Sequence, residues 1–268
     1  MAETNNPSSQ RLTIRIGRGT LAMLVQHAGS DNIVYEPYVV RSGVSMAANL
    51  REAFKSSDLL LQAPPRVRVL IDSDVLMVPV ELFDEQTMAT MYAHAFPSRE
   101  QEAVFYNVLP DLNAVAVFSM NKDLRLVLDD HFQDVRLVAA MQPVWRCMHQ
   151  RSFTGVRRKL YVYFHEKRLD MFSFQQNRFR FCNAYDAPRP MDAVFYITYV
   201  WKQLQLQEEH DELYLMGDIS ADEQPTTQLQ RFIKKVMVIQ PQVEFSHHPV
   251  TELKGVPFDL QTLVVKGM

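Results

Sequence analysis

Residues 12–26 read LTIRIGRGTLAMLVQ, and they predict two β-strands joined by a tight turn. Apolar and polar residues alternate over the first five positions, which is the period of a half-buried strand. Gly17 and Gly19 bracket the turn, and glycine permits the positive φ angles that tight hairpins use. A third strand over 33–40 contains Pro37, which favours an edge strand or a bulge because proline has no N–H to donate.

The next segment has a helical period. Residues 44–56 predict a helix because Met46, Leu50 and Phe54 recur every four residues. Two prolines then break the chain before residues 67–71 (VRVLI), an apolar run typical of a buried strand. The predicted unit is therefore a three-strand meander, a crossover helix and a further strand.

The second half of the chain has the same order of patterns. Residues 160–174 read LYVYFHEKRLDMFSF, which again predicts a strand, a polar turn and a strand. A third strand over 179–184, a helix over 190–207 and a buried strand over 213–216 follow.

The offset between the two sets is nearly constant. Leu12 corresponds to Leu160, and Leu21 to Leu169, both 148 residues apart. The third and fourth strands, which begin at Ile33 and Val67 in the first half, are offset by 146. Five elements in the same order favour an internal duplication over chance agreement between two α/β segments.

The middle and the end of the chain are less regular. The predicted middle elements are a helix over 84–94, strands over 114–119, 124–128 and 135–139, and a helix over 144–151. The second half continues with a helix over 227–235, a strand over 236–239 and a polar tail with His247 and His248. The predicted organisation is a disordered tail over 1–10, a first half over 11–150 with a subdomain inserted around 74–134, and a second half over 151–268.

Composition excludes several classes of protein. The 268 residues are 47% hydrophobic and 22% charged, with a net charge of −3, as in an ordinary globular protein. Without a basic stripe, no nucleic-acid partner is expected. Residues 1–10 lack the apolar core of a signal peptide, and no run of about 18 apolar residues occurs. We therefore expect no membrane span and a cytoplasmic location.

The cysteines and histidines of the chain do not form a recognisable metal-binding motif. Cys147 and Cys182 have no partner motif, which favours small buried hydrophobes over a disulfide or zinc site. His247 and His248 lack a third ligand at a recognisable spacing. Asp72 and Asp74 follow a strand, and two interpretations stay open for them: an acid pair or metal ligand in a cleft, or a solvated loop.

Glycine is scarce, with 8 residues in the chain, about 3% against the usual figure of about 7%. Phosphate-binding loops depend on glycine because the backbone approaches the ligand closely. No Walker loop, no Gly-x-Gly-x-x-Gly fingerprint and no Gly-x-Ser-x-Gly elbow occurs.

A unit of a three-strand meander, a helix and a strand occurs twice in the chain, and this arrangement resembles the actin-like ATPase (ribonuclease H-like) fold. Together with the segment VPVELFD at 78–84, the chain resembles an uncharacterised bacterial family found among Bacteroidetes, with an actin-like fold and unknown function. The resemblance implies a duplicated α/β architecture, in which each half has a β-meander, a crossover helix and a mixed sheet. In that superfamily a nucleotide lies in the cleft between the halves.

The superfamily's phosphate motifs are degenerate in this chain. The first hairpin usually carries Asp-x-Gly, with the aspartate helping to hold hydrated magnesium, but Arg15 stands at that position. The second hairpin has no glycine over 163–167, and Gly217 with Asp218 matches half of a late double-glycine turn. The resemblance therefore implies no usual ATP hydrolysis, no catalytic residues and no required cofactor.

Two functions remain open from the sequence. The first is a non-catalytic actin-like protein that serves as a cytosolic scaffold or interaction module with another protein as its partner. The alternative is an ATPase-like protein with an unconventional nucleotide or anion site, with ATP as a possible ligand. Its candidate residues are Arg15, Gly17, Arg18, Gly19, Thr20, Gly217 and Asp218. The turn at 17–20 alternatively needs its glycines only for hairpin geometry.

Overall fold

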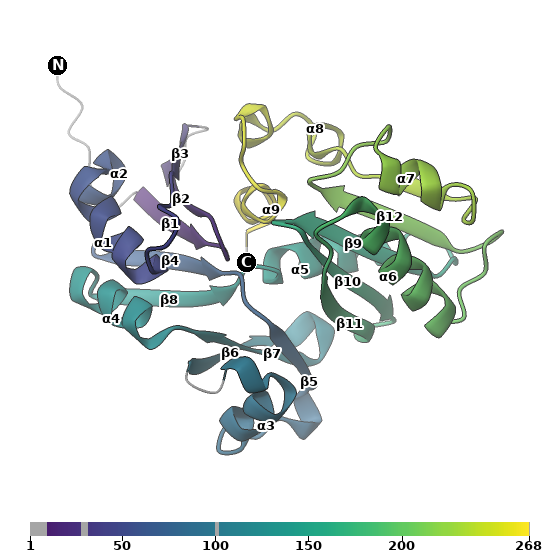
Figure 1. Cartoon of the computed structure of the whole chain (residues 1–268), viewed down its shortest axis with the longest axis horizontal. Helices are drawn as coiled ribbons and strands as arrows, with labels where there is room; N and C mark the ends of the chain where they lie inside the picture. Colours follow the sequence, from purple (N-terminus) through teal and green to yellow (C-terminus); the bar gives the residue numbers. More distant parts are fainter. Residues whose placement is uncertain (1–9, 28–31, 100–101, 268) are drawn as a thin grey trace. The chain divides into compact units, whose positions relative to one another are not determined.

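The computed structural model describes residues 10–27, 32–99 and 102–267, and the chain divides into two units (Figure 1). The first unit comprises Met1–Val108, Val115–Gln142 and Leu253–Val256. The second comprises Leu109–Ala114, Pro143–Glu252 and Pro257–Met268. The predicted tail over 1–10 lies outside the described residues except for Gln10, where the first strand begins.

The first unit is built on a five-stranded sheet of order β3-β2-β1-β4-β8. Its strands are β1 (Gln10–Ile16), β2 (Leu21–His27), β3 (Ile33–Tyr38), β4 (Arg66–Ile71) and β8 (Asp134–Ala139). β1, β2 and β3 form an antiparallel meander, while β4 pairs in parallel with β1 and β8 in parallel with β4. Pro37 lies on an edge strand, as its missing N–H predicts.

Helices α1 (Met46–Ser56) and α2 (Asp58–Leu61) follow this meander. α1 begins at Ser45, whose side chain accepts a hydrogen bond from the backbone N–H of Ala48. One face of α1 is buried, through Ala47, Leu50 and Ala53, and the opposite face is polar. The predicted crossover helix over 44–56 is confirmed.

The second unit repeats the same sheet, in the order β11-β10-β9-β12-β13. Its strands are β9 (Lys159–His165), β10 (Arg168–Gln175), β11 (Arg178–Asp186), β12 (Glu212–Gly217) and β13 (Val236–Val238). Three antiparallel strands are again followed by two that pair in parallel. The duplication predicted from the sequence is confirmed by this identical strand order.

The pairing registers of the two sheets also correspond. Leu12 of β1 pairs with Val67 of β4, and Leu160 of β9 pairs with Leu213 of β12. These are the equivalences that the offsets of 148 and 146 predict. The drift from 148 to 146 falls in the connection before the third strand, because Gln26 pairs with Ile33 whereas Phe174 pairs with Phe179. A β-bulge between Ser173 and Phe174 then places one extra residue in β11.

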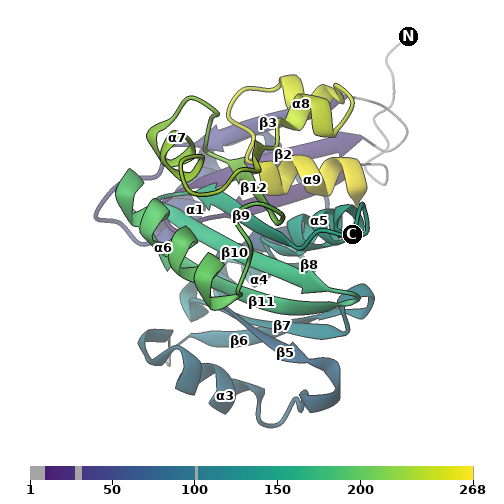
Figure 2. The same ribbon diagram turned by 90° about the vertical axis from the view of Figure 1, so that its right-hand side faces the viewer.

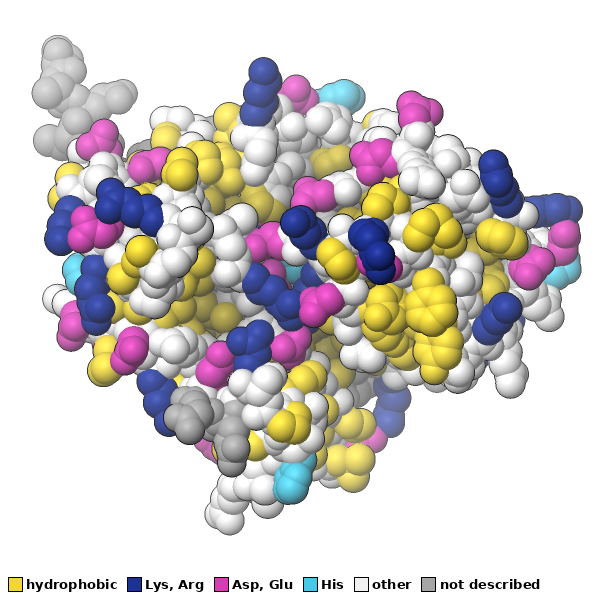
Figure 3. Space-filling view, in the orientation of Figure 1, with side chains coloured by type: hydrophobic (Ala, Val, Ile, Leu, Met, Phe, Trp, Pro, Cys, Tyr) yellow, Lys and Arg dark blue, Asp and Glu magenta, His cyan; other side chains and the backbone are white. Residues whose placement is uncertain are grey.

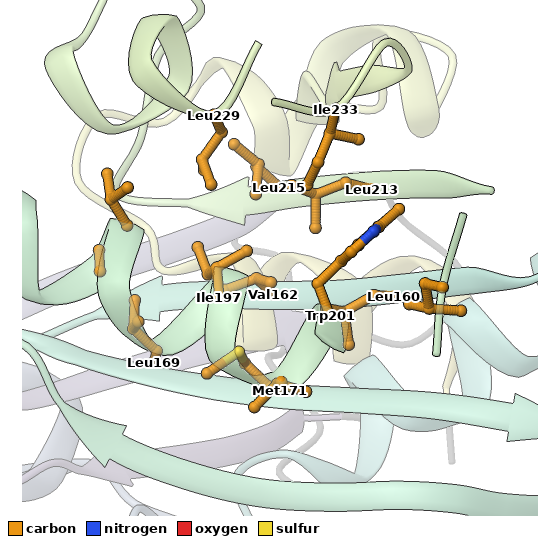
Figure 4. Packing of buried hydrophobic residues seen from close by; sticks show 14 of the residues in the cluster. Leu160, Val162, Leu169, Met171, Ile197, Trp201, Leu213, Leu215, Leu229 and Ile233 are labelled. Carbon is orange, nitrogen blue, oxygen red and sulfur yellow. The ribbon is translucent and has the colours of Figure 1, made fainter. Parts of the chain in front are cut away.

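One face of the second sheet is covered by α6 (Pro190–Gln203), which lies over β9, β10 and β11 (Figure 2), and by α7 (Gln224–Leu229). Figure 4 shows that Ile197 and Trp201 of α6 point toward the apolar side chains of the strands. The labelled members of this core are Leu160, Val162, Leu169, Met171, Ile197, Trp201, Leu213, Leu215, Leu229 and Ile233.

The opposite face of this sheet is packed by α5 (Gln142–Ser152) and α9 (Phe258–Lys266), and the short helix α8 (Pro241–Glu244) precedes α9 in the sequence. Trp145 of α5 meets the ring of Phe179 edge-on at 5.7 Å between centroids. Phe258 of α9 contacts the ring of Tyr163 at 6.0 Å. The strands β9 and β10 are therefore buried on both faces, whereas the edge strand β11 is only partly buried.

A small subdomain lies between β4 and β8 in the sequence. It contains the three-stranded sheet β5-β7-β6 and helix α3, with a core formed by Val78, Tyr92, Val115 and Val117. The bounds are β5 (Val75–Pro79), α3 (Met88–Ala95), β6 (Ala103–Leu109) and β7 (Ala114–Met120). The sequence analysis identified β7 but missed β5 and β6, and the helix predicted over 84–94 begins at Met88. Short 3-10 helices occur at Val80–Leu82, Pro97–Arg99, Pro110–Leu112 and Pro249–Glu252.

The strand predicted over 124–128 is wrong, because these residues lie in helix α4 (Lys122–His131). Leu124, Val127 and Leu128 are buried at the spacing of one helical face. Alternation within the short run LRLVL resembles a strand over five residues, and only the longer segment reveals the helical period.

Loss of the α4 cap is expected to destabilise the first unit. Asn121 Oδ1 accepts hydrogen bonds from the backbone N–H groups of Asp123 (2.9 Å) and Leu124 (3.2 Å). Asn121→Ala removes both, and we expect a loss of about 1 kcal/mol in urea unfolding followed by circular dichroism. Asn121→Asp keeps an acceptor and should unfold close to wild type. An alanine variant as stable as wild type would contradict the cap.

Two predictions for the last part of the chain are also wrong. The helix predicted over 227–235 is α7, which begins earlier at Gln224 and ends at Leu229. The predicted polar tail instead contains α8 and α9, and Phe258, Leu260 and Leu263 of α9 are buried. Prolines and glycines at 249–257 interrupt the hydrophobic pattern before α9, which hid the helix from the sequence analysis.

Candidate functional site

The first hairpin carries five of the seven predicted site residues. Gly17 N–H donates to the carbonyl of Thr20 at 2.8 Å, which closes the turn between β1 and β2. The guanidinium of the buried residue Arg15 donates to Thr20 Oγ1 at 3.0 Å. A cation therefore lies at the position where the resemblance implies a magnesium-holding aspartate, and this cation contacts its own hairpin.

Arg18, at the tip of the same turn, belongs to an ion-pair chain within the first unit. Its guanidinium contacts Asp74 at 3.1 Å, and Asp74 also contacts Arg99 at 3.3 Å. Arg99 in turn contacts Glu102 at 2.9 Å. Burial lowers the pKa of Arg99, but the carboxylates of Glu102 and Asp74 together raise it by more, so the pKa lies above its usual value. The structure therefore places Asp74 in a charge network that ties the hairpin to the inserted subdomain.

Tyr92 of α3 is hydrogen-bonded to this network. Its hydroxyl donates to the backbone carbonyl of Asp74 at 2.7 Å and lies 3.0 Å from Ser119 Oγ. Ser119 also donates to Glu102. Burial raises the pKa of Tyr92 to about 12, so its hydroxyl remains a hydrogen-bond donor at neutral pH.

Removal of the Asp74 carboxylate is expected to weaken the first unit. Asp74→Asn removes the negative charge between Arg18 and Arg99, whose side chains are about one-third exposed, and we expect a loss of about 1–2 kcal/mol. Asp129→Asn, which affects one exposed pair with Arg125, should cost less than about 0.5 kcal/mol. Urea unfolding followed by circular dichroism compares the two. Equal losses would show that the network adds nothing beyond an ordinary surface pair.

The second hairpin, between β9 and β10, turns without glycine. Glu166 and Lys167 adopt φ angles of 45° and 62°, the left-handed values of a tight turn. Nε2 of His165 lies 2.6 Å from Oδ2 of Asp170, and Nε of Arg168 donates to the same oxygen at 3.0 Å. This hairpin is therefore held by buried side chains of its own unit.

An aromatic pair extends the same cluster. The Tyr163 ring stacks on His165 with centroids 4.5 Å apart, and the Tyr163 hydroxyl donates to Asp259 of α9 at 3.3 Å. Tyr163 is the residue that corresponds to Arg15 at the repeat offset. Neither hairpin presents a carboxylate at this position.

Gly217 and Asp218, the remaining predicted site residues, lie at the end of β12. Gly217 has a φ of +89°, and a Cβ there would lie 2.2 Å from the carbonyl oxygen of Phe164 and 2.5 Å from the ring of Tyr163. Asp218 N–H donates to the Phe164 carbonyl at 2.8 Å. The close approach of the Gly217 backbone to β9 leaves no room for a side chain, and this packing alone accounts for a glycine at position 217.

The seven predicted site residues thus belong to two different units. Arg15, Gly17 and Thr20 contact one another in the first unit, together with Arg18 and Gly19 of the same turn. Gly217 and Asp218 are neighbours in the second unit. Their assignment to a nucleotide or anion site stays a prediction.

The structure shows the burial of the two cysteines and the contacts of His247 and His248. Cys147 is buried, as predicted, and burial raises the pKa of its thiol to about 11. Cys182 is only half-buried, which departs from the prediction. His247 lies 3.8 Å from Glu252, and Nδ1 of His248 accepts from the backbone N–H of Val250 at 3.3 Å.

The outer face of α6 is a surface that the sequence analysis missed. Met191, Phe195 and Tyr199 follow one another at intervals of four residues, with exposures of 52%, 61% and 49%. Figure 3 shows the hydrophobic side chains gathered over this helix. The signal was present in the sequence PMDAVFYITYVWKQ, because Met191, Phe195 and Tyr199 recur every four residues on the side opposite the buried residues of the helix.

Comparisons with known proteins agree with the fold. A family model described as "Protein of unknown function (DUF3822)" matches residues 2–236. A crystal structure from Bacteroides thetaiotaomicron, of a protein with an actin-like ATPase fold and unknown function, is similar over 98% of both chains at 26% identity and a TM-score of 0.85. The predicted actin-like fold and the resemblance to a Bacteroidetes family of unknown function are confirmed.

A more distant similarity is to the PilM–PilN type IV pilus biogenesis complex. It has 12% identity and a TM-score of 0.53, and covers 96% of this chain and 95% of the other. No curated protein is similar in sequence. Among the described helices, none has the length and apolar character needed to cross a membrane.

Proposed function

Because the chain belongs to this family of proteins of unknown function, no activity is carried over from a relative, and we propose that it is a non-catalytic actin-like protein. Its role is to bind another protein through the outer face of α6. The observation that carries the proposal is the exposed stripe of Met191, Phe195 and Tyr199.

The composition of the stripe suits a protein interface. Aromatic residues and methionine are enriched at the buried centres of interfaces, where they supply large contact areas. Full burial of one such side chain stabilises a complex by about 1.5–3 kcal/mol, so three half-exposed side chains supply a useful part of a binding energy. Phe195 and Tyr199 already stack on each other, with centroids 6.3 Å apart, and so lose little freedom on binding.

The charged residues beside the stripe indicate which charge a binding partner carries. Asp192 is engaged by Arg189 at 3.2 Å, and Lys202 lies at the last turn of α6 on the stripe's side. An apolar segment with an acidic end is therefore the best complement to this face. PilM–PilN, whose fold is similar, is itself a complex, which supports a role in protein association.

The hairpins support the non-catalytic part of the proposal. Magnesium prefers carboxylate and other oxygen ligands, and Arg15 supplies a guanidinium at the position of the usual aspartate. Asp74, a nearby carboxylate, contacts Arg18 and Arg99.

Site-specific photo-crosslinking tests the interface in cells that produce the protein. A photoreactive phenylalanine at position 195 should give one discrete adduct with another protein. Tyr199→Asp should abolish that adduct, and the same probe at Leu126, an exposed residue of α4, should not give it. An adduct between two copies of this chain, an adduct unaffected by Tyr199→Asp, or no adduct would each contradict the proposal.

A further inference from the structure

A second surface lies on the first unit, along the exposed side of α1 and α2. It is a groove of about 710 Å³, which we call the α1 groove; the residues that matter here are Arg41, Val44, Arg51, Phe54, Lys55 and Leu61. Every residue of this groove belongs to the first unit.

Part of the α1 groove is apolar. Leu61 and Val44 both line it and are 63% and 46% exposed. Phe54 also lines the groove, and its ring stacks on that of His131 with centroids 3.7 Å apart. An exposed apolar surface inside a groove favours a ligand with apolar side chains, because burial removes that surface from water.

The rest of the α1 groove is positively charged. Arg41, Arg51 and Lys55 supply three permanent cations, while Glu52 is the one carboxylate among the groove's residues. The hydrogen bond from Lys55, at 2.8 Å, lowers the pKa of Glu52, so this carboxylate is ionised at neutral pH. Figure 3 shows several Lys and Arg side chains over the region of α1 and α2, with Asp and Glu side chains beside them.

We propose that the α1 groove binds an acidic amphipathic segment of a protein. Apolar side chains of the segment pack against Phe54, Leu61 and Val44, while its carboxylates face Arg41, Arg51 and Lys55. Nucleic acid supplies negative charge without aliphatic side chains, so the apolar part of the groove favours a peptide. A polypeptide that carries both apolar side chains and carboxylates can contact the apolar and the charged parts of the α1 groove at once.

This inference extends the proposed interaction role but concerns a different unit. The α6 stripe accepts a mainly apolar segment, whereas the α1 groove requires negative charge. Failure of either test leaves the other intact, because the variants used and the surfaces probed do not overlap.

Selection from a random 16-residue peptide library on the immobilised full chain tests the groove. We expect enriched peptides to combine Asp or Glu with Leu, Ile, Phe or Trp. Their affinity, measured by fluorescence anisotropy, should fall at least tenfold in the Arg51→Glu, Lys55→Glu double variant and weaken as salt rises. Arg136→Glu reverses an exposed charge on β8 of the same unit and should leave the affinity unchanged.

Leu61→Asn separates the apolar contribution because it adds no charge, and it should also weaken the binding of the enriched peptides while the thermal unfolding of the chain stays close to wild type. Enrichment of peptides without acidic residues, or affinities that the double variant does not change, would overturn the proposal. So would charge-dependent binding of phosphatidylglycerol vesicles or oligothymidine in the absence of any selected acidic peptide, because it would assign the groove to a membrane or to nucleic acid.

Discussion

Replacement of Gly217 by alanine is expected to destabilise the second unit by about 3 kcal/mol or more. The added Cβ would lie 2.2 Å from the backbone oxygen of Phe164, which cannot move without disturbing β9. A left-handed φ of +89° adds about 1–2 kcal/mol of strain for a residue with a side chain, and overpacking adds about 1–3 kcal/mol.

Urea unfolding followed by tryptophan fluorescence measures this loss, because Trp145 and Trp201 both lie in the second unit. Gly155→Ala is the matched control: its φ is +74°, but its Cβ would meet nothing within 4 Å. The control should therefore cost only the backbone strain, about 1–2 kcal/mol. Equal losses in the two variants would contradict the close approach of β12 to β9.

Truncation of Trp201 is expected to cost about 3–5 kcal/mol, the usual range for a large buried aromatic side chain. Trp201 is 4% exposed and packs from α6 against the core of the second unit (Figure 4). Since a typical domain is stable by about 5–15 kcal/mol, Trp201→Ala should unfold at a much lower urea concentration.

Phe195→Ala, on the same helix, is the informative control. Phe195 is 61% exposed, so its removal should cost less than about 1 kcal/mol in circular dichroism unfolding. The contrast separates the folding face of α6 from its proposed binding face. A loss for Phe195→Ala as large as that for Trp201→Ala would show that the stripe serves the fold, which would weaken the case for an interface.

The two large sheets were predictable because each strand has a clear hydrophobic period. Leu12 and Leu160 begin equivalent strands, and their partners Val67 and Leu213 keep the same register. An internal repeat supplies two independent examples of one pattern, so errors in one half are corrected by the other. The drift in offset reflects the shorter connection before the third strand of the second half, where Phe174 pairs with Phe179 as Gln26 pairs with Ile33.

The errors fall where no second copy exists. Strands β5 and β6 belong to an insertion without a counterpart, and the run at 124–128 was too short to reveal the period of α4. Helix α9 follows a stretch broken by Pro249, Gly255 and Pro257, and its burial depends on contacts with β9 that local sequence does not encode.

The candidate sites show the same division. The sequence alone indicated a cation at Arg15 and the loss of glycine in the second hairpin, because residue type at an aligned position is sufficient for that argument. The contacts of Asp74 with Arg18 and Arg99 could not be predicted from the sequence, because they join residues far apart in the chain. The α6 stripe was encoded as apolar residues on more than one side of the helix, but only the structure shows which of them lack cover among the described residues.

The duplicated actin-like fold is present, and we propose that this chain does not use it to bind and hydrolyse a nucleotide. Isothermal titration calorimetry of the folded chain with ATP, with and without magnesium, tests it most directly. We predict no binding tighter than about 1 mM, corresponding to about −4 kcal/mol, in either condition. A micromolar dissociation constant that depends on magnesium and is accompanied by release of inorganic phosphate would contradict the claim.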